Sequence, residues 1–352
     1  MPPYKFSRRL FLPISLKAGE PLQKVKLAYS RNARYLAAIA NRQMTLWDAH
    51  TYDTKAIFVK ESSDITGLYW LSIDPNILIS SDSKGRIFVS YLLTHTIDTV
   101  WFRSGNPVTT IAANSAETLL ALATNEPDTT EIWALNINRG PDYSSNLNCH
   151  MLGLLPSRPT IGGVHASSTV SNLHFLNDDN LLVAYQDGAV ITWSISRDNP
   201  HVLAYHIDSM RINNGLLQDI SPDFATIAVA EAPSYKIYTF PKPVPDEVFD
   251  VPQSSGPTSS ELASMLYVHD GTQVLGTGIG KTVLWHALSG RRLQTLSYPE
   301  RESNCPVVGL SAAVDITNGY LKIATAIYGS NRYTVSIWEA RPSFASTFLL
   351  LH

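Results

Sequence analysis

Aromatic residues recur along this chain at a nearly constant interval. The segments MTLWDAH, TTEIWALN, AVITWSIS, YKIYTFPK, KTVLWHAL and VSIWEA each place an aromatic residue after a run of β-branched residues or Leu. The aligned positions are Trp47, Ser90, Trp133, Trp193, Tyr238, Trp285 and Trp338, spaced by 43, 43, 60, 45, 47 and 53 residues. Ser90 holds the second position because RIFVSYLL keeps the strand pattern without the aromatic residue. Five of the seven tryptophans therefore share one structural position, which indicates a repeat.

The repeat is built from strands. Helical periodicity is nearly absent, and short runs rich in Val, Ile, Thr and aromatic residues lie between clusters of Gly, Pro, Asn and Asp. A period of roughly 40–45 residues with four short strands is typical of a β-propeller blade. The sequence therefore predicts an all-β fold, a single seven-bladed β-propeller of four-stranded antiparallel blades. We number the blades one to seven by the seven aligned positions.

Blade six shows the predicted layout most clearly. Its strands are expected at 262–269, 274–279, 282–288 and 292–297, with turns at Asp270-Gly271, Gly280-Lys281 and Ser289-Gly290. Glycine suits these turns because it adopts positive φ at no steric cost. Blade four repeats the layout with VSNLHFL, LLVAYQ, VITWSIS and VLAYHI.

The chain resembles the WD40-repeat propeller family over essentially its whole length, as a degenerate member. That family joins a Trp on the third strand to a hydroxyl on the second, a His before the first and an Asp in the preceding turn. Trp47-Asp48 is the only Trp-Asp pair, and blade four alone shows several of these residues, with His165, Asp187 and Trp193. The resemblance implies an incomplete polar network in every blade, so that packed apolar sheets supply most of the stability.

Two segments qualify as the strand that closes blade seven. Residues 5–15 precede the first strand of blade one by a suitable distance, and the resemblance favours this N-terminal segment. Residues 343–351 follow Trp338 at the interval seen in blade six. We expect the propeller to span residues 1–342, closed by the N-terminal strand, with 343–352 as an extra strand or a loose apolar tail.

Two stretches depart from the period. The 60-residue step before Trp193 leaves an extension of blade three at about 138–168, whose NCHMLGLL segment is expected to form the fourth strand. A Pro- and Ser-rich loop at about 241–261 is expected to carry one edge strand, EVFDV. Long loops on a rigid scaffold often carry binding specificity. A neutral surface insertion explains the extension equally well.

Composition limits the partner and the compartment. The net charge of −3 gives no broad field for phosphate backbones, which makes nucleic acid an unfavoured partner. Cys149 and Cys305 are too few for a disulfide framework and indicate a reducing compartment. The sequence shows neither a signal peptide nor the run of about 18 apolar residues that crosses a bilayer. We expect a cytoplasmic or nuclear protein with no membrane span.

The residues that imitate catalytic or metal sites have structural explanations. LGTGIGKT at 275–282 ends like a phosphate-binding loop, but the residues after Lys281 are predicted to continue as a strand. His201 and His206 are expected on opposite faces of one strand. Neither a nucleophile elbow nor a metal-ligand spacing occurs in the sequence. We therefore expect no catalytic residue, no cofactor and no bound metal.

The candidate binding residues lie on the narrow face of the ring, which this family builds from the loops between second and third strands and between successive blades. Arg and Tyr are enriched where interfaces concentrate their binding energy. The predicted partner-binding residues are Arg42, Lys84, Arg103, Arg211, Tyr235, Arg301, Arg332 and Tyr333, interspersed with Glu61, Asp82, Asp128, Asp187 and Glu302.

Three functional hypotheses follow. The first is a non-catalytic scaffold that presents these loops to a protein or peptide partner, an inference from the fold alone. The second is a propeller that binds or processes a small ligand at the channel mouth, with 138–168 as a wall. The third is a sensor repeat module of a larger multidomain protein. The sequence does not indicate the partner's identity or the oligomeric state.

Overall fold

The chain is an all-β, seven-bladed β-propeller of four-stranded antiparallel blades, which confirms the predicted fold class. This computed structural model describes residues 3–15, 23–40, 42–59, 63–93, 96–102, 106–127, 129–139, 145–156, 158–159, 168–195, 204–212, 215–231, 234–242, 244–250, 264–315, 317–329 and 332–341. The chain groups into two compact units, 1–59 with 218–237 and 245–352, and 60–217 with 238–244.

The first unit holds blades one, six and seven and most of blade five. Blade one comprises β2 (Lys26–Tyr29), β3 (Tyr35–Ala40), β4 (Gln43–Asp48) and β5 (Thr54–Val59). Blade five comprises β18 (Leu216–Ile220), β19 (Thr226–Glu231), β20 (Ser234–Thr239) and β21 (Pro245–Asp250). Blade six comprises β22 (Met265–Val268), β23 (Gln273–Thr277), β24 (Lys281–His286) and β25 (Arg292–Ser297). Blade seven comprises β26 (Val307–Asp315), β27 (Tyr320–Gly329), β28 (Arg332–Ala340) and β1 (Lys5–Ser15).

The second unit holds blades two, three and four. Blade two comprises β6 (Ile65–Trp70), β7 (Ile77–Asp82), β8 (Arg86–Tyr91) and β9 (Thr96–Phe102). Blade three comprises β10 (Val108–Ala113), β11 (Leu119–Thr124), β12 (Thr130–Arg139) and β13 (Ser145–Leu154). Blade four comprises β14 (Val170–Phe175), β15 (Asn180–Tyr185), β16 (Ala189–Ile195) and β17 (Ala204–Arg211). All seven aligned positions therefore fall on third strands, as the period predicts.

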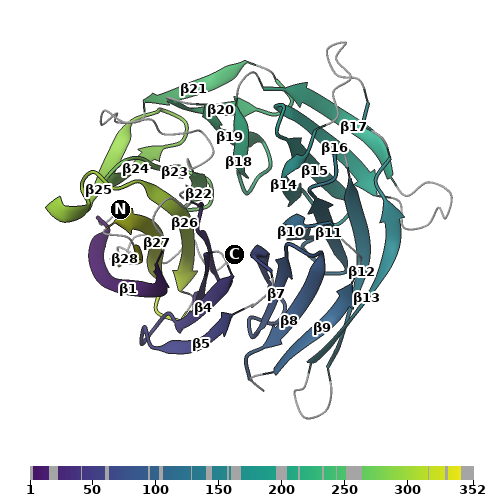
Figure 1. Cartoon of the computed structure of the whole chain (residues 1–352). Helices are drawn as coiled ribbons and strands as arrows, with labels where there is room; N and C mark the ends of the chain where they lie inside the picture. The colour runs from purple at the N-terminus through teal and green to yellow at the C-terminus, as the bar shows by residue number, and fades with distance from the viewer. Residues whose placement is uncertain are drawn as a thin grey trace. The chain divides into compact units, whose positions relative to one another are not determined.

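The N-terminal strand closes blade seven. β1 pairs antiparallel with β28 and completes the order β1-β28-β27-β26 (Figure 1). The competing segment 343–352 lies outside the described residues. Residues 148–154 of NCHMLGLL lie in β13, and residues 247–250 of EVFDV lie in β21, as expected from the two irregular stretches.

The aligned tryptophans pack between consecutive blades. Successive residues of a strand point to opposite faces, so Ile132 joins the apolar cluster shared with blade four whereas Trp133 joins the cluster shared with blade two. Trp47, Trp193, Trp285 and Trp338 likewise each pack against the blade that precedes their own. Both faces of these strands are buried, which explains why the sequence lacks a clear alternation.

A bulge on the outermost strand accompanies each aligned tryptophan. The pairing of third and fourth strands shifts register at Trp47, Trp133, Trp193 and Trp285. In blade seven, Phe6 pairs with Trp338 and Arg8 pairs with Ile337, so the same shift occurs on β1. A bulge interrupts the free edge of a sheet and protects it against the addition of further strands.

The polar network of the family is only partly present. In blade seven the indole Nε1 of Trp338 donates to Thr325 Oγ1 on the second strand at 3.4 Å. In blade four the Trp193 Nε1 has no hydrogen-bond partner among the described residues, and His165 lies outside them. The expectation of an incomplete network is therefore confirmed for blade four, whereas blade seven retains the pair of indole and hydroxyl.

Candidate interaction site

Each blade has two ends that differ in their connections. The connection end carries the turn between second and third strands and the link to the next blade. The turn end carries the turns between first and second and between third and fourth strands. Five of the predicted binding residues lie at connection ends: Arg42 between β3 and β4, Lys84 between β7 and β8, Arg211 at the end of β17, Arg301 between β25 and β26, and Arg332 at the start of β28. Arg103 lies outside the described residues.

Two of the predicted residues are not on the surface. Tyr235 is 1% exposed and Tyr333 is 0% exposed, so the prediction that they contribute to an exposed rim is wrong. The Tyr235 hydroxyl donates to the Thr277 carbonyl at 2.7 Å, and its ring packs edge-on against Trp285. Each tyrosine is the second residue of a third strand. Successive side chains of a strand point to opposite faces, and at this position the side chain packs between two blades.

In blade two, the acidic residue at the connection end is paired within its own loop. The Asp82 carboxylate is fully buried and accepts hydrogen bonds from Arg86 Nε at 2.6 Å and Ser63 Oγ at 2.8 Å. Burial alone would raise the pKa of Asp82, but the bonds from Arg86, Ser63 and the Lys84 amide outweigh it and lower the pKa. Asp82 is therefore an ionised structural anchor, while the Lys84 side chain is exposed.

In blade four, the acidic residue at the connection end is Asp187, and it pairs with an arginine from the blade-three extension. Arg158 Nη1 and Nη2 donate to the two Asp187 oxygens at 3.0 Å each, and the guanidinium stacks on Tyr185 at 4.8 Å. Arg211 Nη2 lies 3.8 Å from Asp187 Oδ2 and is half-buried. Asp187 therefore anchors the end of the extension to blade four, a role that the spacing in the sequence did not indicate.

The same pairing recurs in blades five and seven. Lys236 Nζ lies 2.7 Å from Glu231 Oε1, and Arg9 Nη2 lies 3.0 Å from Glu302 Oε2. Within the described part of the chain, the exposed side chains of Lys84, Arg301 and Arg332 form no ion pair. The connection ends therefore present unneutralised cations, because their carboxylates are committed to internal partners. Glu61 and Asp128 are not among the described residues.

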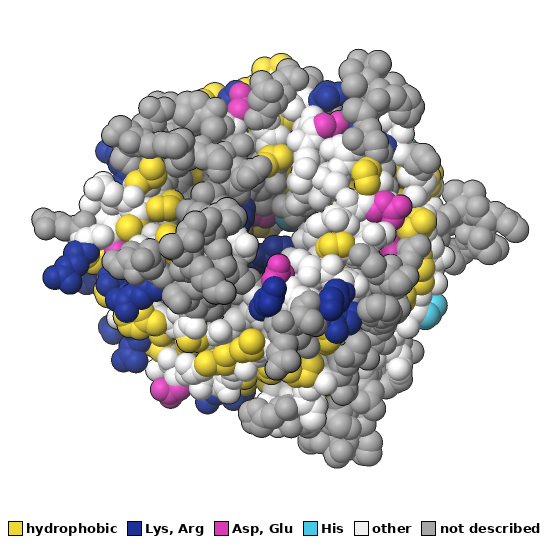
Figure 2. Space-filling view, in the orientation of Figure 1, with side chains coloured by type: hydrophobic (Ala, Val, Ile, Leu, Met, Phe, Trp, Pro, Cys, Tyr) yellow, Lys and Arg dark blue, Asp and Glu magenta, His cyan; other side chains and the backbone are white. Residues whose placement is uncertain are grey.

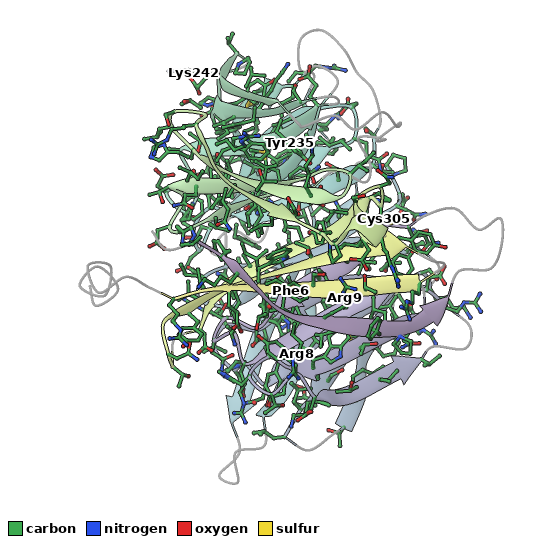
Figure 3. All side chains as sticks on the ribbon, turned by 90° about the vertical axis from the view of Figure 1, so that its left-hand side faces the viewer. Phe6, Arg8, Arg9, Tyr235, Lys242 and Cys305 are labelled. Atoms are coloured by element: carbon green, nitrogen blue, oxygen red, sulfur yellow. The ribbon has the colours of Figure 1, made fainter. Side chains whose placement is uncertain are left out.

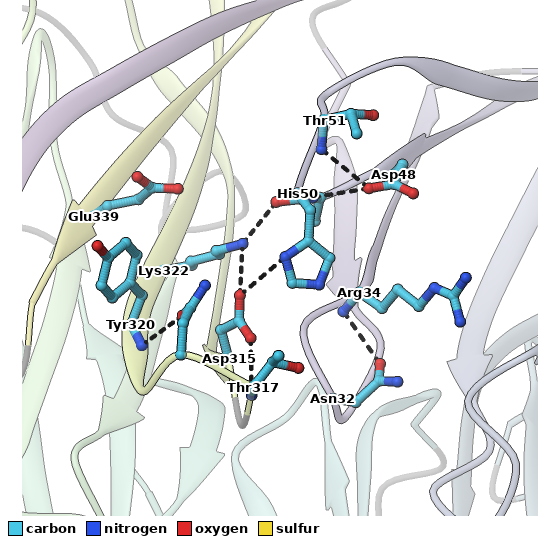
Figure 4. A network of polar contacts seen from close by, with 12 residues as sticks. Asn32, Arg34, Asp48, His50, Thr51, Asp315, Thr317, Tyr320, Lys322 and Glu339 are labelled. Atoms are coloured by element: carbon cyan, nitrogen blue, oxygen red, sulfur yellow. Dashed lines mark hydrogen bonds and ion pairs between the residues drawn. The ribbon is translucent and has the colours of Figure 1, made fainter. Parts of the chain in front are cut away.

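The turn ends are organised differently, because their polar groups join neighbouring blades. Between blades seven and one, the buried Lys322 Nζ lies 3.1 Å from Asp315 Oδ2 and donates to the Ala49 carbonyl at 2.6 Å (Figure 4). His50 Nδ1 lies 3.2 Å from the same Asp315 oxygen. The Tyr52 hydroxyl donates to Glu339, and burial together with this carboxylate raises the tyrosine pKa.

The second unit ties its blades together in the same way. The buried Glu117 carboxylate of blade three accepts hydrogen bonds from the backbone amides of Ser72 and Ile73 of blade two. Asp178 of blade four accepts from Ser115 Oγ at 2.6 Å and from the Ala116 amide at 2.9 Å in blade three. Glu117 and Asp178 therefore hold neighbouring blades together at their turn ends.

The phosphate-loop imitation is a turn. Gly280 has φ of +64°, and a Cβ at this position would lie 1.8 Å from the Ser303 carbonyl oxygen, so only glycine fits. The residues after Lys281 continue as a strand, as predicted, and β24 begins one residue earlier than expected, at Lys281 itself. His206 lies on β17, and His201 lies outside the described residues.

Across the described ranges, no three His, Cys, Asp or Glu side chains are grouped as a metal site would need. No helix in those ranges is long and apolar enough to cross a membrane.

Comparison with known proteins shows the fold only. No protein-family model and no curated protein matches the sequence. A chain in the crystal structure of the mitotic checkpoint complex is similar, with a TM-score of 0.67 and 13% identity over 97% of this chain and 94% of that chain. The β-propeller domain of Cps50 (Swd1) from Myceliophteria thermophila is also similar, with a TM-score of 0.64 and 14% identity over 96% of this chain and 100% of that chain.

Proposed function

We propose that the chain is a non-catalytic interaction scaffold whose connection ends bind an acidic surface of a protein partner. The observation that carries this proposal is the internal pairing of Asp82 and Glu302 beside the exposed Lys84 and Arg301, which have no ion-pair partner in the described chain. Solvent-exposed charges of one sign steer a partner of the opposite sign and select against partners of the same sign.

The solved neighbours support a protein partner in general terms. One of them is a component of the mitotic checkpoint complex, and components of complexes bind other proteins. At 13% and 14% identity they do not indicate which partner this chain binds. The test is therefore made on exposed residues of this chain and does not rely on the shared fold.

The test is affinity capture with charge reversal. Lys84→Glu and Arg301→Glu, each alone, are expected to abolish stoichiometric capture of a protein partner and to leave the melting temperature unchanged. Arg34→Glu is the matched control, because Arg34 is exposed at the turn end of blade one. Raising the salt concentration is expected to weaken capture by the wild type, since exposed charges are screened within about 10 Å at 0.1 M salt.

Two outcomes would contradict the proposal. Capture that persists in both connection-end variants would show that the cations do not contact the partner. Equal loss of capture in Arg34→Glu would show that the effect follows net charge and has no specific location.

A further inference from the structure

The outermost strand of blade seven exposes two phenylalanines. Phe6 is 48% exposed and Phe11 is 50% exposed, both on β1. Outer strands of other blades also expose large apolar side chains, such as Ile57 on β5 at 48% and Tyr205 on β17 at 57%. Half-exposed aromatic rings leave apolar area in water that a partner would stabilise by covering it.

Both rings pack against a neighbouring side chain. Phe6 packs edge-on against Trp338 with ring centroids 5.5 Å apart, and Trp338 packs edge-on against Tyr298 at 5.7 Å. The Arg332 guanidinium lies 4.7 Å from the centroid of the Phe11 ring. A ring already ordered by its neighbours loses little entropy on binding, which is the property of an interface anchor.

The surroundings of the two rings are basic. Arg8 is exposed and lies over the Tyr52 ring at 5.5 Å. The backbone of Tyr4 makes two hydrogen bonds with Gln294, which places β1 beside β25, where Arg292 is exposed. Figure 2 shows Lys and Arg side chains gathered with hydrophobic ones at the left of the view, over β1 and near β25. Figure 3, which faces this side, shows Phe6, Arg8 and Arg9 along β1.

Two carboxylates lie near this surface, and neither forms an ion pair with Arg8 or Arg332 within the described residues. Glu302 pairs with Arg9 at 3.0 Å. Glu339 accepts hydrogen bonds from the Tyr52 hydroxyl and, at 3.0 Å, from Ser7 Oγ. Arg8 and Arg332 contact aromatic rings and form no ion pair within the described ranges, so their charge is available to a partner.

We propose that Phe6, Arg8, Phe11 and Arg332, here named the basic–aromatic edge, bind an acidic peptide segment that carries apolar side chains. This inference rests on the proposed scaffold function and extends it to a surface along β1, which shares Arg332 with the connection end of blade seven. The register shifts at Phe6/Arg8 and Phe11/Ser15 break the ladder of β1, so the peptide binds through side chains and not as an added strand. The chain's net charge of −3 disfavours a phosphate backbone as the occupant.

The probes are three labelled synthetic peptides measured by fluorescence anisotropy. In the first, Glu alternates with Leu and Phe; in the second, Lys replaces Glu; in the third, Ser replaces Leu and Phe. The first peptide is expected to bind about tenfold or more tightly than either of the others, because it alone matches both the charge and the rings.

Two double variants test the surface. Phe6→Ser with Phe11→Ser, and Arg8→Glu with Arg332→Glu, are each expected to weaken binding of the first peptide by about tenfold or more. Ile57→Ser with Val59→Ser on β5 removes comparable exposed apolar area from a neighbouring outer strand and is expected to change nothing. If the phenylalanine variant is unstable, the arginine variant keeps the test decisive, because both arginines are exposed.

The proposal is overturned if the three peptides bind alike or if the variants bind as the wild type does. Tighter binding of polyuridine RNA, or of vesicles containing phosphatidylserine, would also overturn it and assign the edge to that class of ligand. If the peptide test fails but Lys84→Glu loses partner capture, the edge is rejected and the scaffold function is still supported. If the acidic peptide binds as expected but Lys84→Glu and Arg301→Glu do not change partner capture, the connection ends are rejected as a binding site and the edge is retained.

Discussion

The two ends of the blades use polar residues for different purposes. At the turn ends, Lys322, Glu117 and Asp178 reach across to a neighbouring blade and form hydrogen bonds with its backbone groups. At the connection ends, Asp82 closes its own loop and leaves Lys84 in solvent. Exposed cations such as Arg34 occur at turn ends as well, so the proposal for the connection ends rests on the pairing of their carboxylates beside Lys84 and Arg301.

The largest expected effect is at the seam of blades seven and one. Lys322→Met leaves the fully buried Asp315 carboxylate without its lysine, and we expect a loss of about 3–5 kcal/mol in the free energy of unfolding. Urea denaturation measures it. The double variant Lys322→Met with Asp315→Leu should recover much of that loss, since no unpaired charge then remains. A loss below about 1 kcal/mol, typical of exposed pairs, would show that the turn-end network is not structural.

A smaller effect is expected between blades two and three. Glu117→Ala removes the acceptor of two backbone amides, and we expect a loss of about 1–3 kcal/mol. Glu117→Gln keeps one carbonyl oxygen and should lose less. Equal stability of the two variants in thermal and urea unfolding would argue against the inter-blade role of this carboxylate.

At the connection end of blade two, stability should depend on pH. Because the folded-state pKa of Asp82 is lowered, its stabilising effect is present above the ordinary carboxyl pKa and is lost as pH falls through the folded-state pKa. Asp82→Asn cannot titrate, so its unfolding free energy should fall less steeply in acid, and at neutral pH it should be about 1–3 kcal/mol less stable. Urea denaturation from neutral to acid pH measures both, and the exposed Asp53→Asn is the control. If the unfolding free energies of the wild type and Asp82→Asn change with pH in parallel, ionised Asp82 is not the stabilising group.

The smallest effect tests the burial of a residue first assigned to the surface. Tyr235→Phe removes a hydroxyl that donates to Thr277, and we expect a loss of about 1 kcal/mol in unfolding free energy. Partner capture should be unchanged, because the side chain is buried. If Tyr235→Phe loses partner capture while its unfolding free energy is unchanged, Tyr235 contacts the partner after all.

The fold could be predicted from the sequence because its signal is repeated. Trp47, Trp133 and Trp285 each mark a third strand through local periodicity, and Gly280 marks a turn through its φ. The candidate site could be predicted less well. Arg332 and Tyr333 are adjacent in the sequence, yet one is exposed and the other is buried, and nothing local to the pair indicates which one faces the neighbouring blade.

The sequence alone determined the class, the number of blades and their positions along the chain, because the recurring aromatic position and the glycine turns are local properties. Only the tertiary structure decided that residues 5–15 close blade seven, that Asp187 takes Arg158 from the extension, and that Phe6 and Phe11 remain in solvent. Those outcomes depend on contacts between segments distant in the chain. Such contacts are set by packing and charge pairing across blades, which no single stretch of sequence contains.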